Sequence, residues 1–120
     1  IQRDRLQAHA GEAAEQCGAT FVPPVDEMKK LGRVLDHWDG TRRIMFCDET
    51  AAGARRSLRG LSGPWAVLIG PEGGFSPGER DRLQRSEAAY SVSLGPRILR
   101  ADTAAVAALT LWQTTLGDWA

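Results

Sequence analysis

The residues best suited to chemistry lie in a glycine-rich turn at positions 70–74, Gly-Pro-Glu-Gly-Gly. An apolar run before the turn predicts a buried strand, and Ser76-Pro77 after it predicts the start of a helix. Where a strand leads into a helix, backbone N–H groups are left free, and glycines let a ligand approach the main chain closely. The turn therefore indicates a binding edge, although the same residues would also suit an ordinary strand-to-helix loop.

The turn favours some ligands over others. The chain lacks the GxxxxGK[ST] and GxGxxG patterns of phosphate-binding loops, and the carboxylate of Glu72 would repel a pyrophosphate. A carboxylate beside free N–H groups instead favours a ligand with hydroxyl, amine or sulfonium character. The turn thus predicts a small neutral or cationic ligand that is held mainly by the backbone.

Other kinds of site have little support. No serine or cysteine has a base nearby in the sequence, and the two histidines have no partner motif for zinc or for a triad. Cys17 and Cys47 fit no metal-ligand spacing, so we expect reduced core thiols and no metal site. Paired carboxylates for glycoside chemistry are limited to Glu72 and the Asp48-Glu49 pair.

Three short apolar runs predict the strands that position this turn. They are Arg43–Asp48, Trp65–Ile69 and Tyr90–Leu94. Strands that alternate with helices predict an α/β domain with a largely parallel sheet, in which ligands bind beyond the carboxyl ends of the strands. The three predicted strand ends carry residues 48–49, 70–74 and 95–100, and this coincidence favours a binding site at that edge.

Four helices are expected around the sheet. The first spans about 3–17 and stops at Gly18; the second is capped by Asp26 and carries an apolar stripe from Met28 to Trp38. A third helix, from about 77 to 86, has a capping box formed by Ser76 and Glu79. The last helix follows Thr103 and is apolar over most of its circumference, so we expect wide burial against the sheet and a second subunit. The polar segment 50–63 is expected to be a loop with one helical turn near 55–58.

Length and charge set broader limits. The chain has 120 residues, enough for one domain with a core, and its 15 basic and 15 acidic side chains give no global field for nucleic acid. No long apolar run or signal-peptide pattern is present, so we expect a cytoplasmic protein without a membrane partner. The chain opens with Ile1, which indicates an incomplete N-terminus.

Two segments together carry a family resemblance. Residues 68–75, Leu-Ile-Gly-Pro-Glu-Gly-Gly-Phe, and residues 94–104, Leu-Gly-Pro-Arg-Ile-Leu-Arg-Ala-Asp-Thr-Ala, closely resemble the two signature motifs of the RsmE family. These bacterial methyltransferases use S-adenosylmethionine to methylate N3 of a uridine in small-subunit ribosomal RNA. Segments 15–23 and 116–119 also resemble the family, so the likeness covers nearly the whole chain. Asp102 stands where many relatives carry glutamate.

The resemblance implies a SPOUT-type fold, a mostly parallel sheet flanked by helices with a deep trefoil knot. It implies a homodimer joined through the knotted region, with ribosomal RNA in the small subunit as partner. Residues 1–120 would then be a truncated catalytic domain that lacks the family's PUA-like RNA-binding domain. The implied methyl-donor pocket is lined by two knot loops, residues 70–74 and 94–103, with residues 47–49 nearby. Its residues would be Leu68, Ile69, Gly70, Pro71, Glu72, Gly73, Gly74, Leu94, Gly95, Ile98, Leu99, Arg100 and Thr103.

The candidate catalytic residues are Arg97, Arg100 and Glu72. We expect the arginines to bind phosphate or stabilise the developing uracil anion, or else to pair with Glu72 or Asp102 and hold the knot. The sequence does not identify a general base. Two other functions stay open: a SPOUT methyltransferase that acts on transfer RNA, and a non-catalytic RNA-associated scaffold.

Overall fold

The structure is a computed structural model that describes residues 2–48, 58–71, 73–95 and 97–120. It divides into two compact units, residues 1–37 and residues 38–120. The first unit contains helix α1 (Arg3–Cys17), an extended connector and helix α2 (Leu31–Asp36). The second contains a sheet and two helices. Every described helix is too short or too polar to cross a membrane.

Helix α1 matches its predicted bounds, because its signals are local. Gly18 ends the helix in the left-handed region at φ 75°, and its N–H group donates to the last turn. The connector then runs back along the helix. Gln7 accepts a hydrogen bond from the N–H of Val25 at 2.7 Å, and Arg3 donates to the carbonyl of Val25 at 2.6 Å.

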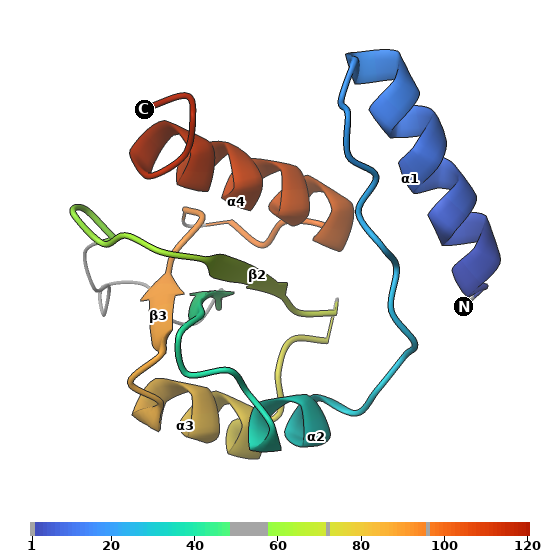
Figure 1. Ribbon diagram of the computed structural model, residues 1–120. Coiled ribbons are helices and arrows are strands. Elements are labelled where there is room, and N and C mark those ends of the chain that lie inside the picture. The colour runs from blue at the N-terminus through green and yellow to red at the C-terminus, as the bar shows by residue number, and fades with distance from the viewer. Residues whose placement is uncertain (1, 49–57, 72, 96) are drawn as a thin grey trace. The chain divides into compact units, whose positions relative to one another are not determined.

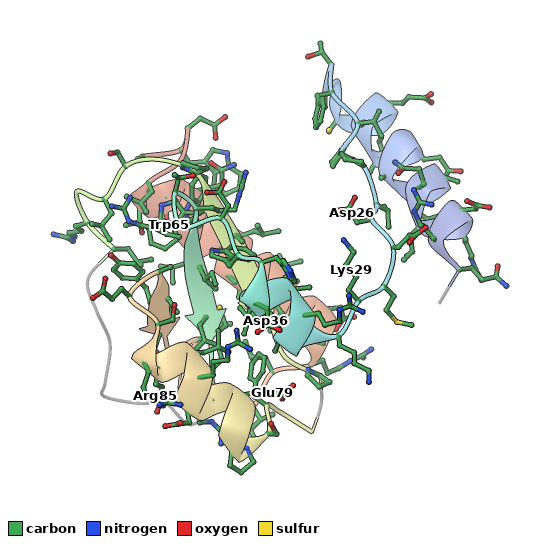
Figure 2. All side chains as sticks on the ribbon, turned by 60° about the horizontal axis from the view of Figure 1, so that its bottom comes forward. Asp26, Lys29, Asp36, Trp65, Glu79 and Arg85 are labelled. Atoms are coloured by element: carbon green, nitrogen blue, oxygen red, sulfur yellow. The ribbon has the colours of Figure 1, made fainter. Side chains whose placement is uncertain are left out.

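The predicted start of the second helix at Asp26 is wrong. Helix α2 begins at Leu31 after Lys30, and Asp26 and Lys29 lie on the extended connector (Figure 2). Both backbone groups of Val25 are taken by side chains of α1, so this stretch is held extended by contacts distant in sequence. The side chain of Met28, expected on an apolar helical stripe, is 80% exposed.

The sheet has three parallel strands, as the sequence predicts. They are β1 (Arg43–Cys47), β2 (Trp65–Ile69) and β3 (Ala89–Val92), in the order β2-β1-β3. The last residue of β1, Cys47, pairs with Ile69 on one side and Val92 on the other, so all three strands end at one edge. Strand β3 stops before the predicted Leu94, because the Ser93 hydroxyl bonds the backbone of Gly95 and the chain turns there.

Two helices cover opposite sides of the sheet (Figure 1). Helix α3 (Pro77–Arg85) has the predicted capping box: the N–H of Glu79 donates to the Ser76 hydroxyl, and the Glu79 carboxylate accepts from the N–H of Ser76. Leu83 is its buried contact. Figure 2 shows Glu79 and Arg85 at opposite ends of this helix.

Helix α4 (Ala101–Thr115) begins earlier than predicted, because the carbonyl of Arg100 already accepts from the N–H of Ala104. Ala108 is fully buried in a cluster with Met45, Tyr90 and Val92. In the single chain this helix is buried over only part of its circumference, and its burial against a second subunit stays a prediction. Val106 is 67% exposed and Leu109 is 53% exposed, so α4 packs on the sheet along one stripe only.

The polar segment before β2 is described only from Leu58 onward. The helical turn predicted near 55–58 therefore falls outside the described residues except for Leu58 itself. The side chain of Leu58 is buried in the cluster under α4. This segment thus contributes to the core as well as to the surface.

Candidate functional site

A pocket lies where the three parallel strands end. The register brings Cys47, Ile69 and Val92 side by side, and the segments that follow the strands form its walls. It has about 560 Å³ of space free of protein atoms, part of which is open to solvent. Its lining residues are Cys47, Asp48, Ile69, Gly70, Pro71, Gly74, Phe75, Val92, Leu94, Arg97, Leu99, Ala101 and Ala104.

The glycine-rich turn after β2 forms one wall, and its glycines are needed there. A Cβ atom on Gly70 would lie 2.8 Å from Cε2 of Phe75, whose ring packs edge-on against Phe46 at 4.8 Å between centroids. Gly74 has φ 75°, and its N–H group donates to the carbonyl of Pro71 at 2.8 Å. Only glycine combines this close approach at 70 with an unstrained left-handed residue at 74.

The segment between β3 and α4 forms the opposite wall. Gly95 turns the chain with φ 105°, and Leu94, Arg97 and Leu99 line the pocket. Ala101 and Ala104, in the first turn of α4, close this side with small side chains. The two segments that carry the family motifs therefore face one another across a single pocket.

The end of β1 supplies the remaining boundary, with one charged and one neutral group. Asp48 is 2% exposed, and one of its carboxylate oxygens accepts from Nε of Arg80 at 2.8 Å. Arg80 also donates to the carbonyl of Phe75 at 3.3 Å. Burial raises the pKa of the Cys47 thiol from 9.0 to about 11, so this side chain stays protonated and uncharged at neutral pH.

The predicted site residues divide into two groups. Arg97 and six of the thirteen residues expected to bind the donor line the pocket: Ile69, Gly70, Pro71, Gly74, Leu94 and Leu99. Among the described residues, six others stand outside its lining: Leu68, Gly73, Gly95, Ile98, Arg100 and Thr103. Glu72 lies outside the described residues.

Two residues in the second group are strongly exposed. The side chain of Ile98 is 75% exposed, and that of Arg100 is 80% exposed. Arg100 lies 3.6 Å from the carboxylate of Asp102, a loose ion pair at the surface. The side chains of both residues therefore face solvent in the single chain.

Three lining residues lie outside the predicted walls and the nearby strand end: Phe75, Val92 and Ala104. Val92 was missed because the strand was expected to end two residues later, at Leu94. Ala101 falls within the predicted wall 94–103, and Ala104 was missed because α4 was expected to begin only after Thr103. In residues 2–48, 58–71, 73–95 and 97–120, no three histidine, cysteine or acidic side chains gather as metal ligands.

The lining suits a ligand with a flat apolar portion and a few polar groups. Apolar side chains from all three strands surround glycine backbone, and the Asp48 charge is paired with Arg80. Pockets for small organic ligands share this mostly apolar character with few polar groups. S-adenosylmethionine, with its adenine ring and its short polar tail, fits these residues.

Known proteins resemble both the sequence and the fold. A family model described as an RNA methyltransferase domain matches residues 1–113. "Ribosomal RNA small subunit methyltransferase E" of Rickettsia conorii is 31% identical over 114 residues, which are 91% of this chain and 46% of that protein. The Bacillus subtilis protein of the same name is 30% identical over 125 residues, 96% of this chain and 48% of that protein.

A solved structure agrees with this likeness. The ribosomal RNA small subunit methyltransferase E of Neisseria gonorrhoeae, bound to S-adenosyl methionine, superposes with a TM-score of 0.83 at 33% identity. It matches 98% of this chain and 49% of its own, so the chain spans about half the length of these relatives. The resemblance inferred from the two motifs is confirmed, and the chain belongs to the RNA methyltransferase domain family.

Proposed function

We propose that this chain is the catalytic domain of an enzyme that transfers a methyl group from S-adenosylmethionine to N3 of a uridine in small-subunit ribosomal RNA. The observation that carries the proposal is the single pocket formed by the two motif segments, 69–75 and 94–104. The names of the relatives support the substrate class, and the donor in the Neisseria structure supports the cofactor.

The reaction needs a donor, an oriented acceptor and a route for one proton. The donor supplies an electrophilic methyl group on a positively charged sulfur. At the acceptor, the N3–H bond breaks, the proton passes to a base, and the N3–C bond forms as the S–C bond breaks and leaves a neutral thioether. Holding the partners in line contributes several kcal/mol, and a positioned base adds about two to four orders of magnitude in rate.

The described residues account for part of this task. The strand ends and the glycine-rich turn hold the donor, and the protonated thiol of Cys47 adds no charge to the pocket at neutral pH. Arg97 lines the pocket, so its guanidinium is suited to stabilise the anion that forms when N3 loses its proton. Arg100 is exposed, which suits a contact with RNA phosphate, and its pairing with Asp102 is the structural alternative. No residue is assigned as the base.

We further propose that the chain acts as a homodimer in the cytoplasm, with a deep trefoil knot that includes the pocket walls. The exposed side chains of Val106 and Leu109 on α4 support a subunit contact, because an apolar helix face gains stability when it is covered. Sedimentation of the full-length protein tests whether it is a dimer. A dimer that Val106→Asp converts to a monomer supports the contact, and a monomeric wild-type protein refutes it.

Two measurements on the full-length protein test the function. Calorimetry with S-adenosylhomocysteine should show one binding site per chain; no binding would contradict the enzyme and favour a scaffold. Methylation of small ribosomal subunits that lack the modification should exceed methylation of bulk transfer RNA. The reverse preference would assign the domain to transfer RNA instead.

A further inference from the structure

Arg80 of helix α3 connects two parts of the pocket without lining it. Its Nε atom donates to the Asp48 carboxylate at 2.8 Å, just after β1. Its Nη2 atom donates to the carbonyl of Phe75 at 3.3 Å, at the end of the glycine-rich turn. One guanidinium thus joins the end of β1 to the residue that follows the glycine-rich turn, and both joined residues line the pocket.

The contact with Asp48 is not an ordinary surface ion pair. The Asp48 side chain is 1% exposed and that of Arg80 is 25% exposed, whereas Arg85 and Asp81 on the same helix are 75% and 63% exposed. A buried carboxylate needs a partner, because an unpaired buried charge is strongly unfavourable. Asp48 is therefore held at a defined place at the pocket boundary.

The contact with Phe75 fixes the other part. The Phe75 ring fills the space beside Gly70 and packs on Phe46, and the Gly74 N–H bonds back to Pro71. Arg80 adds an anchor on the backbone that directly follows Gly74. A guanidinium has several donors in a rigid plane and can serve both acceptors, whereas a lysine has a single nitrogen for them.

We propose that Arg80 is a positioning residue for the methyl-donor pocket. It holds Asp48 and the 70–75 turn in the arrangement that receives the donor, so donor affinity depends on a side chain outside the lining. This inference rests on the proposed function for the identity of the ligand. It differs from a purely stabilising pair, because it requires the turn itself to change when Arg80 is altered in a protein that stays folded.

The test uses the full-length protein with Arg80→Lys, Arg80→Ala and the matched control Arg85→Ala. Circular dichroism establishes that each variant is folded, calorimetry gives Kd for S-adenosylhomocysteine, and hydrogen exchange follows the Gly73 and Gly74 amides without ligand. If the turn adopts its ligand-binding conformation only about a tenth of the time without Arg80, Kd for S-adenosylhomocysteine rises about tenfold. We expect this for Arg80→Ala, a smaller rise for Arg80→Lys, and faster exchange in both. Arg85→Ala, an exposed pair, should stay within about twofold of wild type.

The outcomes are separable. Unchanged Kd and unchanged exchange in Arg80→Lys and Arg80→Ala would overturn the proposal while leaving the methyltransferase function intact. If Arg80→Ala does not fold, Arg80→Lys decides, because it keeps a cation near Asp48 and loses the fixed second donor to Phe75. If the wild-type protein binds no donor product, the proposed function fails and so does Arg80's role in donor binding. Exchange at Gly74 then still decides whether Arg80 holds the turn.

Discussion

Gly70 and Phe75 share one space at the pocket wall: a Cβ atom on Gly70 would lie 2.8 Å from Cε2 and 3.1 Å from Cζ of the Phe75 ring. The ring cannot move away freely, because it packs edge-on against Phe46 in the core. The glycine therefore sets the position of the aromatic ring, and the ring sets the shape of the turn that follows β2.

Gly70→Ala should destabilise the protein, because the added methyl group overlaps a packed ring. We expect the free energy of unfolding to fall by about 1–3 kcal/mol and Kd for the donor product to rise. Urea denaturation and calorimetry measure the two effects. Gly78→Ala is the control: no atom lies within 4 Å of its added Cβ, and it is in helix α3, where alanine is preferred to glycine. Equal stability of the two variants would contradict the overlap.

Removing the cap of helix α3 should cost stability through a local effect. Ser76→Ala loses the hydroxyl that accepts from the N–H of Glu79, and we expect the free energy of unfolding to fall by about 0.5–2 kcal/mol. Ser76→Asp keeps an acceptor at the cap and should restore most of the loss. A thermal melt of the three proteins decides, and a Ser76→Ala protein as stable as wild type would refute the cap.

The Cys47 thiol should make the protein less stable at alkaline pH. Its pKa is raised by burial to about 11 in the folded state, above the ordinary 9.0. The neutral thiol therefore contributes stability that is present below pH 9 and is lost as the pH rises toward 11. We expect Cys47→Ala to show a flatter dependence of unfolding free energy on pH in that range. A dependence as steep as that of wild type would assign the loss to other groups.

The two free cysteines should also differ in reactivity. Cys17 is exposed, so its predicted place in the core is wrong, whereas Cys47 is partly buried with a raised pKa. At pH 8 we expect iodoacetamide to label Cys17 first, and mass spectrometry of digested protein gives the order. The Cys17→Ser protein should then react far more slowly with iodoacetamide than the wild-type protein. Rapid labelling of Cys47 in that variant would contradict its burial.

Arg97→Ala and Arg100→Ala should separate donor binding from methylation. If Arg97 stabilises the uracil anion, its loss lowers methylation by about 100-fold, as for other single transition-state donors, while Kd for the donor product changes little. Arg100 is exposed, so Arg100→Ala should raise KM for the ribosomal subunit and make it less sensitive to salt. Loss of folding in the Arg100 variant would instead support a structural role with Asp102.

Two local signals at helix ends are confirmed, whereas the local signal at Asp26 is overridden by contacts from distant residues. The Ser76 capping box and the Gly18 stop depend on residues a few positions apart, and both are present. The second helix was placed too early because Gln7 and Arg3 capture Val25 from 18 and 22 positions away. Helix propensities do not predict hydrogen bonds between residues so far apart in the sequence.

The candidate site also combines features that the sequence predicts with contacts that it does not. The parallel sheet and its edge followed from alternating strands and helices, and the two motifs marked both walls of the pocket. The pairing of Asp48 with Arg80 joins residues 32 positions apart, and no spacing rule predicts it. In the sequence, Arg80 is one of several charged residues on a polar helix. Only the fold shows that it contacts Asp48 after the end of β1.

The strand order has a consequence for how the protein matures. Met45 in the central strand pairs with Val67 and also with Tyr90, so the wall that follows β3 forms only when the last strand joins the sheet. Pairings between distant residues form slowly, because a long segment must be closed first. We therefore expect the pocket to be among the last features to form during refolding. Recovery of donor binding should lag behind recovery of the helical circular dichroism signal. Binding of the ligand would then report that β3 has joined the sheet.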